Sequence, residues 1–122
     1  MAASAIAIMR VRDVLMVTVP EDADDETIAQ LQERVLQNMD KQKTSGLVVD
    51  ISTVETFDSY FARTIVETAR MVALMGGRTV VSGMRPSVAI TATQLGLKLG
   101  DAASALSVES ALAILDGTNG QR

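Results

Sequence analysis

The sequence predicts a single α/β domain with one mixed, mostly parallel sheet of about five strands and about four helices. Short apolar runs rich in Val and Ile alternate along the chain with longer segments of helical periodicity, which is the pattern of βαβ crossovers. The run GLVVDIS is apolar without alternation, as in a strand buried on both faces of a parallel sheet. A chain of 122 residues forms one compact core rather than two.

The first part of the chain predicts a hairpin followed by a helix. Residues 5–11 and 14–19 are apolar, and Arg12 and Asp13 separate them, which indicates two strands joined by a tight turn. An acidic cluster, EDADDE, then marks a solvated helix N-terminus. Apolar residues recur at helical spacing beyond it and predict a first helix over about residues 25–41: Ile28, Leu31, Val35, Leu36 and Met39.

The remaining elements follow the same alternation. The strand GLVVDIS precedes a second helix over about residues 59–75, which Gly76 and Gly77 end. RTVVSG is a short buried strand, Pro86 begins a third helix that ends at Gly96, ASAL is a weak last strand, and Ser107 caps a fourth helix. The inward residues of the second helix are predicted to be Phe61, Ile65, Ala69, Val72 and either Leu74 or Met75. We expect a core over about residues 5–116 and a flexible tail at 117–122.

Composition excludes several classes of function. The net charge is -4 with a pI near 4.7 and no basic tract, which argues against nucleic acid or an anionic membrane as a partner. The chain contains neither Cys nor His, so it lacks the commonest metal ligands and the commonest general base, and we expect no metal, no cofactor and no enzymatic activity. It shows no signal peptide and no apolar run of about 20 residues, which predicts a cytoplasmic protein without a membrane span.

Two predicted loops meet at one edge of the sheet, because loops that leave the carboxyl ends of parallel strands gather there. They are STVETFDS and SGMRPS. In the first, either Asp58 or Ser59 can cap the second helix. The alternative is that the Ser59 hydroxyl is a phosphate acceptor, since a helix N-terminus accommodates added negative charge. Arg63 lies one turn further on the same face and is a candidate partner for that phosphate.

Asp50 ends the buried strand and raises a second possibility, the phosphoacceptor of a receiver-type signalling domain. That chemistry requires a magnesium-binding acidic cluster after the first strand and a lysine after the last, and neither VTVP nor SALS supplies them. We therefore expect Asp50 to bind loop N–H groups and to shape the turn into the second helix.

With these residues in view, the chain resembles the STAS family of bacterial signalling domains. The resemblance covers about residues 6–115, and its specific parts are the buried strand that ends in Asp50, the Asp58–Ser59 pair and the G-x-x-P segment at 83–86. It implies a single STAS domain over the whole chain. It also implies that a partner surface lies around the acceptor loop, with these candidate residues: Asp50, Asp58, Tyr60, Arg63, Met84 and Arg85.

Within the family, the chain is most similar to the RsbS-type scaffold proteins of the stressosome. This resemblance implies that an RsbT-like serine kinase phosphorylates Ser59, and that phosphorylation releases the sequestered kinase. RsbR-like STAS proteins and an RsbX-like phosphatase are the other implied partners, in a large oligomeric assembly. Thr91 matches a second phosphorylated position of RsbR proteins and is a candidate second acceptor.

Two other classes of function stay open. A free anti-anti-sigma factor would bind an anti-sigma kinase directly. Such proteins usually have small residues after the serine. In this chain Tyr60 and Phe61 follow Ser59, which favours the scaffold. A ligand-binding or enzymatic α/β domain could work with Asp, Ser, Lys and Arg alone, although the absence of His and Cys argues against it.

Overall fold

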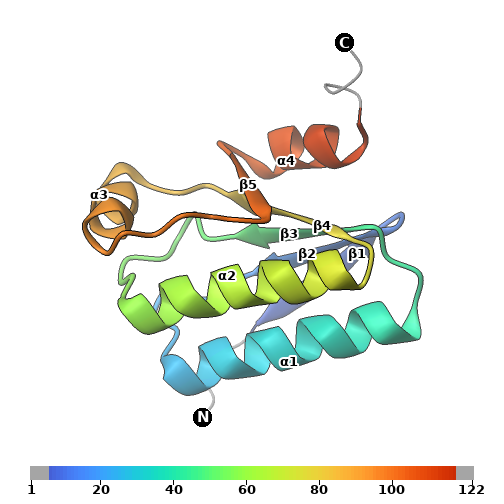
Figure 1. Ribbon diagram of the computed structural model, residues 1–122, viewed down its shortest axis with the longest axis horizontal. Helices are drawn as coiled ribbons and strands as arrows, with labels where there is room; N and C mark the ends of the chain where they lie inside the picture. The colour runs from blue at the N-terminus through green and yellow to red at the C-terminus, as the bar shows by residue number, and fades with distance from the viewer. Residues whose placement is uncertain (1–5, 118–122) are drawn as a thin grey trace.

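The computed structural model describes residues 6–117 and contains one five-stranded sheet in the order β1-β2-β3-β4-β5 (Figure 1). β1 and β2 are antiparallel, whereas β2, β3, β4 and β5 run parallel to one another, so the predicted mixed, mostly parallel sheet is confirmed. The strands are β1 (Ala7–Val11), β2 (Val14–Thr18), β3 (Gly46–Asp50), β4 (Arg78–Ser82) and β5 (Ala102–Ala105).

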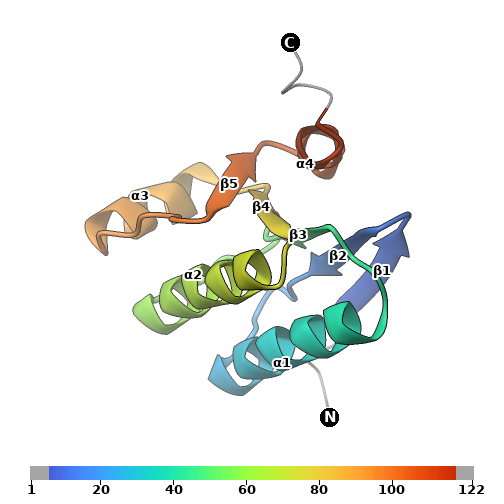
Figure 2. The same cartoon turned by 45° about the vertical axis from the view of Figure 1, so that its right-hand side comes forward.

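Four helices surround the sheet, as predicted: α1 (Asp25–Lys41), α2 (Ser59–Leu74), α3 (Pro86–Gln94) and α4 (Val108–Leu115). α1 and α2 lie side by side on one face, and the short α4 lies on the other (Figure 2). α3 lies beyond the end of the sheet where β4 finishes (Figures 1 and 2). Of the predicted tail at 117–122, residues 118–122 lie outside the described residues.

The hairpin and the first helix match their predictions. Arg12 turns the chain between β1 and β2 with a φ of 58°, and α1 has the predicted bounds. Asp24 caps α1: its carboxylate accepts hydrogen bonds from the Thr27 N–H at 2.9 Å and the Thr27 hydroxyl at 2.7 Å. The bonds from the Thr27 hydroxyl and N–H lower the pKa of Asp24, because they stabilise its charged form.

The main core lies between the sheet and α1 and α2. Leu47, Val48 and Val49 of β3 are almost fully buried, which confirms a central strand covered on both faces. Phe61, Ile65, Ala69 and Val72 of α2 face this core as predicted, with exposures of 5% or less.

The prediction that Leu74 or Met75 also faces inward is wrong. Leu74 is 84% exposed and Met75 is 45% exposed. Leu74 follows the last inward residue, Val72, by only two positions, which places it on the opposite side of the helix. α2 then ends, and the chain turns through Gly76 with a φ of 91° before another inward position is reached.

A buried hydroxyl in β4 generates a prediction about stability. Thr79 is 3% exposed, and its Oγ1 has no hydrogen-bond partner among residues 6–117. Thr79→Val replaces the hydroxyl with a methyl group of similar size, so the variant should be more stable by up to about 1 kcal/mol. Urea unfolding at neutral pH measures the change.

Thr68→Val is the matched control for Thr79→Val. The Thr68 hydroxyl is also buried, but it donates to the Thr64 carbonyl at 2.7 Å and accepts from the Gln32 amide at 3.0 Å. Its removal should cost about 1 to 2 kcal/mol, because the Gln32 amide loses its partner. Similar destabilisation of both variants would contradict the assignment of Thr79 as an unsatisfied group.

The cap of α1 generates a prediction about pH. Because the folded pKa of Asp24 is lowered, its contribution to stability is complete above the unfolded value of about 4 and is lost as pH falls through the folded value. Asp24→Asn keeps a capping side chain but removes the charge. The melting temperature of wild type should therefore exceed that of Asp24→Asn at neutral pH by more than it does in acid; a constant difference would contradict the prediction.

Candidate functional site

The candidate site lies at the carboxyl edge of the parallel strands, where the loops after β3 and β4 meet. Thr18, Asp50 and Ser82 lie in one register row at the ends of β2, β3 and β4. The loops after β3 and β4 then approach closely at Gly83, where an added Cβ would lie 2.7 Å from the Ser52 Cβ. Gly83 also has a φ of 79°, so both space and backbone favour glycine there. The expectation that the two loops share an edge is confirmed.

Asp50 holds this edge together. Its Oδ1 accepts a hydrogen bond from the Ser52 N–H at 3.1 Å and a longer one from the Ser82 hydroxyl at 3.4 Å. The Ile51 N–H donates to the Ser82 carbonyl at 2.9 Å, which extends the contact between β3 and β4 into the loop. Asp50 is therefore the turn-shaping carboxylate that the sequence predicted.

The loop after β3 ends in a cap that leaves Ser59 accessible. Asp58 is the N-cap of α2, and its Oδ1 accepts a hydrogen bond from the Phe61 N–H at 2.9 Å. Phe61 is 3% exposed, and its ring lies 5.1 Å from that of Phe57, which fixes the first turn in the core. Ser59 is the first residue of the helix and is exposed. Of the two candidate caps, Asp58 thus takes the capping role, and the Ser59 hydroxyl is available to a partner.

Tyr60 and Arg63 form the outer part of this first turn. The Arg63 guanidinium lies 5.7 Å from the centroid of the half-buried Tyr60 ring, within cation–π range. Arg63 is exposed and forms no salt bridge within residues 6–117. A cation one turn from Ser59 is therefore available to a phosphate.

The remaining predicted residues belong to α3 and the turn before it. Met84 is half-buried and packs against the main core, and Arg85 is the exposed N-cap of α3 with no side-chain cap hydrogen bond. Thr91 lies within α3, half-buried, and its hydroxyl donates to the Ser87 carbonyl at 3.1 Å. The two candidate acceptors, Ser59 and Thr91, therefore differ in the accessibility of their hydroxyls, because the Thr91 hydroxyl is hydrogen-bonded to the backbone of its own helix.

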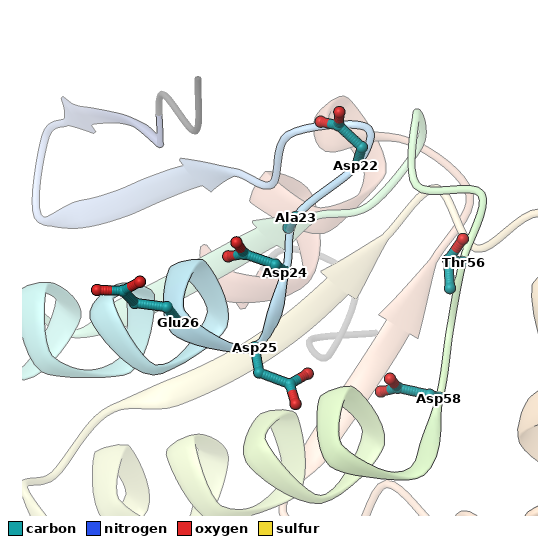
Figure 3. Close-up of a pocket in the computed structure, with 7 residues that line it drawn as sticks. All are labelled: Asp22, Ala23, Asp24, Asp25, Glu26, Thr56 and Asp58. Carbon is teal, nitrogen blue, oxygen red and sulfur yellow. The ribbon is translucent and has the colours of Figure 1, made fainter. Parts of the chain in front are cut away.

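An acidic groove beside Ser59 is the feature that sequence reasoning missed. It has a volume of about 580 Å³, and it lies between the starts of α1 and α2, where Asp25 and Asp58 reach toward each other (Figure 3). Its lining residues are Asp22, Ala23, Asp24, Asp25, Glu26, Thr56 and Asp58. The sequence did carry a signal for this groove. The acidic segment EDADDE follows β2, and the carboxyl ends of β2 and β3 lie at the same edge of the sheet.

The acidic groove is not arranged as a metal centre. No three Asp or Glu side chains between residues 6 and 117 come together in a way that could hold a metal ion. No helix in the same range is long and apolar enough to cross a membrane.

Comparison with curated proteins finds relatives named for antagonism of RsbT. The chain is 36% identical over 76 residues to the RsbT co-antagonist protein RsbRB of Bacillus subtilis, and this covers 62% of the chain and 27% of the relative. It is 31% identical over 94 residues to RsbRC of the same organism, covering 77% of the chain and 33% of that protein. The chain thus spans about a third or less of these two relatives.

Comparison with solved structures finds matches over nearly the whole chain. A variant of RsbS from Moorella thermoacetica has a TM-score of 0.83 and 34% identity, covering 95% of this chain and 98% of that one. A chain from the molecular architecture of the stressosome has a TM-score of 0.80 and 35% identity, covering 93% and 98%. The unphosphorylated anti-sigma factor antagonist SpoIIAA has a TM-score of 0.75 over 93% of this chain, but its 16% identity shows only a common fold.

The family itself is shown by a match over most of the chain. The STAS domain model matches residues 5–111, which include every strand of the sheet, the acceptor loop and α3. The chain belongs to the STAS domain family.

Proposed function

We propose that this protein is a non-catalytic scaffold of a stressosome-type complex, which holds an RsbT-like serine kinase and releases it when Ser59 is phosphorylated. RsbR-like STAS proteins are its assembly partners, and an RsbX-like phosphatase restores the unmodified state. The similarity over nearly full length to RsbS supports this proposal, as does the similarity to proteins named RsbT co-antagonists. A cytoplasmic location stays a prediction.

The observation that carries the proposal is the presentation of Ser59. A neighbouring carboxylate already caps α2, so modification of the serine hydroxyl does not remove the cap. Within the described residues the Ser59 hydroxyl has no hydrogen-bond partner, and the residue is exposed. The acceptor can therefore enter a kinase active site without unfolding the first turn of α2.

The kinase supplies the chemistry in this proposal. The bond between Ser59 Oγ and the γ-phosphorus of ATP forms as the bond to ADP breaks, and a base of the kinase takes the hydroxyl proton. Magnesium arrives with the nucleotide. The scaffold contributes an ordered helix start and an exposed hydroxyl.

Release follows from the charge that phosphorylation adds. When a partner covers a neutral serine hydroxyl, the free-energy cost of removing water from it is small. A phosphate carries a charge of about -1.5 to -2, and its desolvation costs much more. Asp58 precedes Ser59 in the chain and lines the acidic groove, so the new charge is added next to a region that is already negative. A kinase surface that fits the unmodified edge is expected to lose affinity for the phosphorylated one.

A scaffold and a free anti-anti-sigma factor are expected to differ in the size of the assembly that they form with an RsbR-like STAS protein. On the sequence alone, the bulky residues after Ser59, Tyr60 and Phe61, favour a scaffold. Phe61 is also a core residue in this chain, so its size is explained in part by packing. Gel filtration of the protein mixed with an RsbR-like STAS protein distinguishes the two functions. A large mixed particle is expected for a scaffold, and separate elution for a free regulator.

The first prediction of the proposed function concerns Ser59 as the phosphate acceptor. Incubation with an RsbT-like kinase and Mg-ATP should add one phosphate to Ser59, located by peptide mass spectrometry. Ser59→Ala should remove this phosphate, whereas Ser104→Ala, at an exposed serine in β5, should not. Phosphate on Thr91 but not on Ser59 would contradict the assignment.

The second prediction concerns kinase binding. Ser59→Ala should stay folded and bind the kinase like the unphosphorylated wild type. Ser59→Asp should bind at least about tenfold more weakly, because it places a second carboxylate beside Asp58. Surface plasmon resonance with immobilised kinase measures both affinities. Equal affinities for the two variants would refute the switch.

The third prediction concerns Arg63. If its guanidinium pairs with the phosphate, Arg63→Ala should lower the stability of the phosphorylated protein by about 0.5 kcal/mol more than that of the unphosphorylated protein. Arg70→Ala, at an exposed arginine further along α2, is the control and should affect both forms equally. Equal losses for Arg63→Ala would show that this residue is only a surface arginine.

A further inference from the structure

The first turn of α2 carries an aromatic side chain directly beside the acceptor. Tyr60 follows Ser59, and its half-buried ring packs against the main core. The Arg63 guanidinium lies over this ring, with its Cζ atom 5.7 Å from the ring centroid. The side chains of Ser59, Tyr60 and Arg63 therefore belong to one surface at the start of α2.

The Arg63 side chain is directed toward the start of the helix. Long side chains of a helix point back toward its N-terminus, and Arg63 stands four positions after Ser59 and three after Tyr60. Glu67 offers a carboxylate four positions further on, yet Arg63 forms no salt bridge with it in the part of the chain that the structure describes. In the unmodified protein the guanidinium thus contacts the Tyr60 ring.

The geometry of the helix makes Ser59 and Tyr60 competitors for this guanidinium. Successive residues of an α-helix are about 100° apart around its axis, so Ser59 and Tyr60 point in different directions, and Arg63 lies between them. A guanidinium over the Tyr60 ring is turned away from the Ser59 side. A phosphate on Ser59 attracts it more strongly than the face of a neutral ring does, because the pair is charge-assisted on both sides. Phosphorylation is therefore expected to draw Arg63 away from Tyr60.

The loss of this contact changes the surface that a partner meets. In the unmodified protein, Arg63 covers the exposed part of the Tyr60 ring and restricts its motion. An aromatic side chain that is already held in place loses little conformational entropy on binding, and tyrosine is among the residues that contribute most to binding energy in interfaces. Once Arg63 has moved to a phosphate, Tyr60 is no longer held in this way.

From the contact of Arg63 with Tyr60 and the position of Arg63 between Tyr60 and Ser59, we propose that Arg63 changes partner when Ser59 is phosphorylated. Tyr60, held by Arg63 in the unmodified form alone, is the aromatic side chain by which the kinase recognises that form. Phosphorylation then removes a binding contact in addition to adding charge. This inference rests on the proposed function, since it takes Ser59 as the acceptor and the kinase as the partner.

Tyrosine fluorescence tests the change of partner without a kinase. The chain has one tyrosine and no tryptophan, so its intrinsic emission reports on the Tyr60 ring alone. Phosphoserine incorporated at position 59 during translation supplies the modified protein. Quenching by acrylamide, which is uncharged, should become more efficient on phosphorylation and should reach the value of unphosphorylated Arg63→Ala.

Two control variants make this measurement specific. In Arg63→Ala, phosphoserine at position 59 should cause no further increase in quenching, because the ring is already uncovered. In Arg70→Ala, at an exposed arginine further along α2, it should cause the same increase as in wild type. Unchanged quenching in the phosphorylated wild type would overturn the proposal, as would an equal increase in Arg63→Ala.

Kinase binding to the unphosphorylated variants tests the role of Tyr60. Tyr60→Leu and Arg63→Ala should each raise the dissociation constant at least about tenfold, and Tyr60→Phe, which keeps the ring, should restore most of the affinity. If Arg63 acts by holding Tyr60, the double variant should bind about as weakly as Tyr60→Leu alone. Additive losses would show that Arg63 contacts the kinase independently. Arg63 is exposed, so Arg63→Ala remains a valid test if Tyr60→Leu is poorly folded.

The change of partner and the kinase switch can fail separately. If the kinase neither binds the protein nor phosphorylates Ser59, the proposed function is wrong, and the acrylamide measurement with phosphoserine still decides whether Arg63 leaves Tyr60. If phosphorylation releases the kinase but Tyr60→Leu binds it like wild type, the proposed function stands and release is due to charge alone. That second result would refute the role of Tyr60.

Discussion

The in-register pairing of β2, β3 and β4 is the constraint on which the rest of this structure depends. The apolar residues of β3 make it a strand that is stable only when both faces are covered, which requires parallel neighbours and helices on either side. Because the three strands end in the same row, at Thr18, Asp50 and Ser82, their loops leave the sheet together. The loop before α2, the turn before α3 and the acidic start of α1 meet for this reason.

The placement of Ser59 follows from two local interactions at this edge. Asp58 takes the cap of α2, and burial of Phe61 fixes the rotation of the helix, so Ser59 faces solvent. The same edge gathers the carboxylates of the acidic groove, which makes it a poor place for a further negative charge under a bound partner.

Most of the fold could be predicted from the sequence because its signals are local. The bounds of α1, the turn at Arg12, the start of α3 at Pro86 and the cap at Ser107 all depend on residues close in the chain. Leu74 was misplaced because periodicity alone does not say where the core ends along a helix. The acidic groove was missed for a tertiary reason: its two sides come from α1 and α2, and only the parallel pairing of β2 with β3 brings them together. The exposure of Ser59 likewise depended on which of two adjacent residues capped the helix.

The most direct test of the central claim is the affinity of an RsbT-like kinase for this protein before and after complete phosphorylation of Ser59. Isothermal titration calorimetry of both forms, and of the phosphorylated form after phosphatase treatment, measures it without a mimic. The account predicts tight binding, loss of binding on phosphorylation and recovery after the phosphate is removed. Equal affinity of the phosphorylated and unphosphorylated forms would contradict it, and Ser59 would then be an exposed residue of α2 without a role in kinase release.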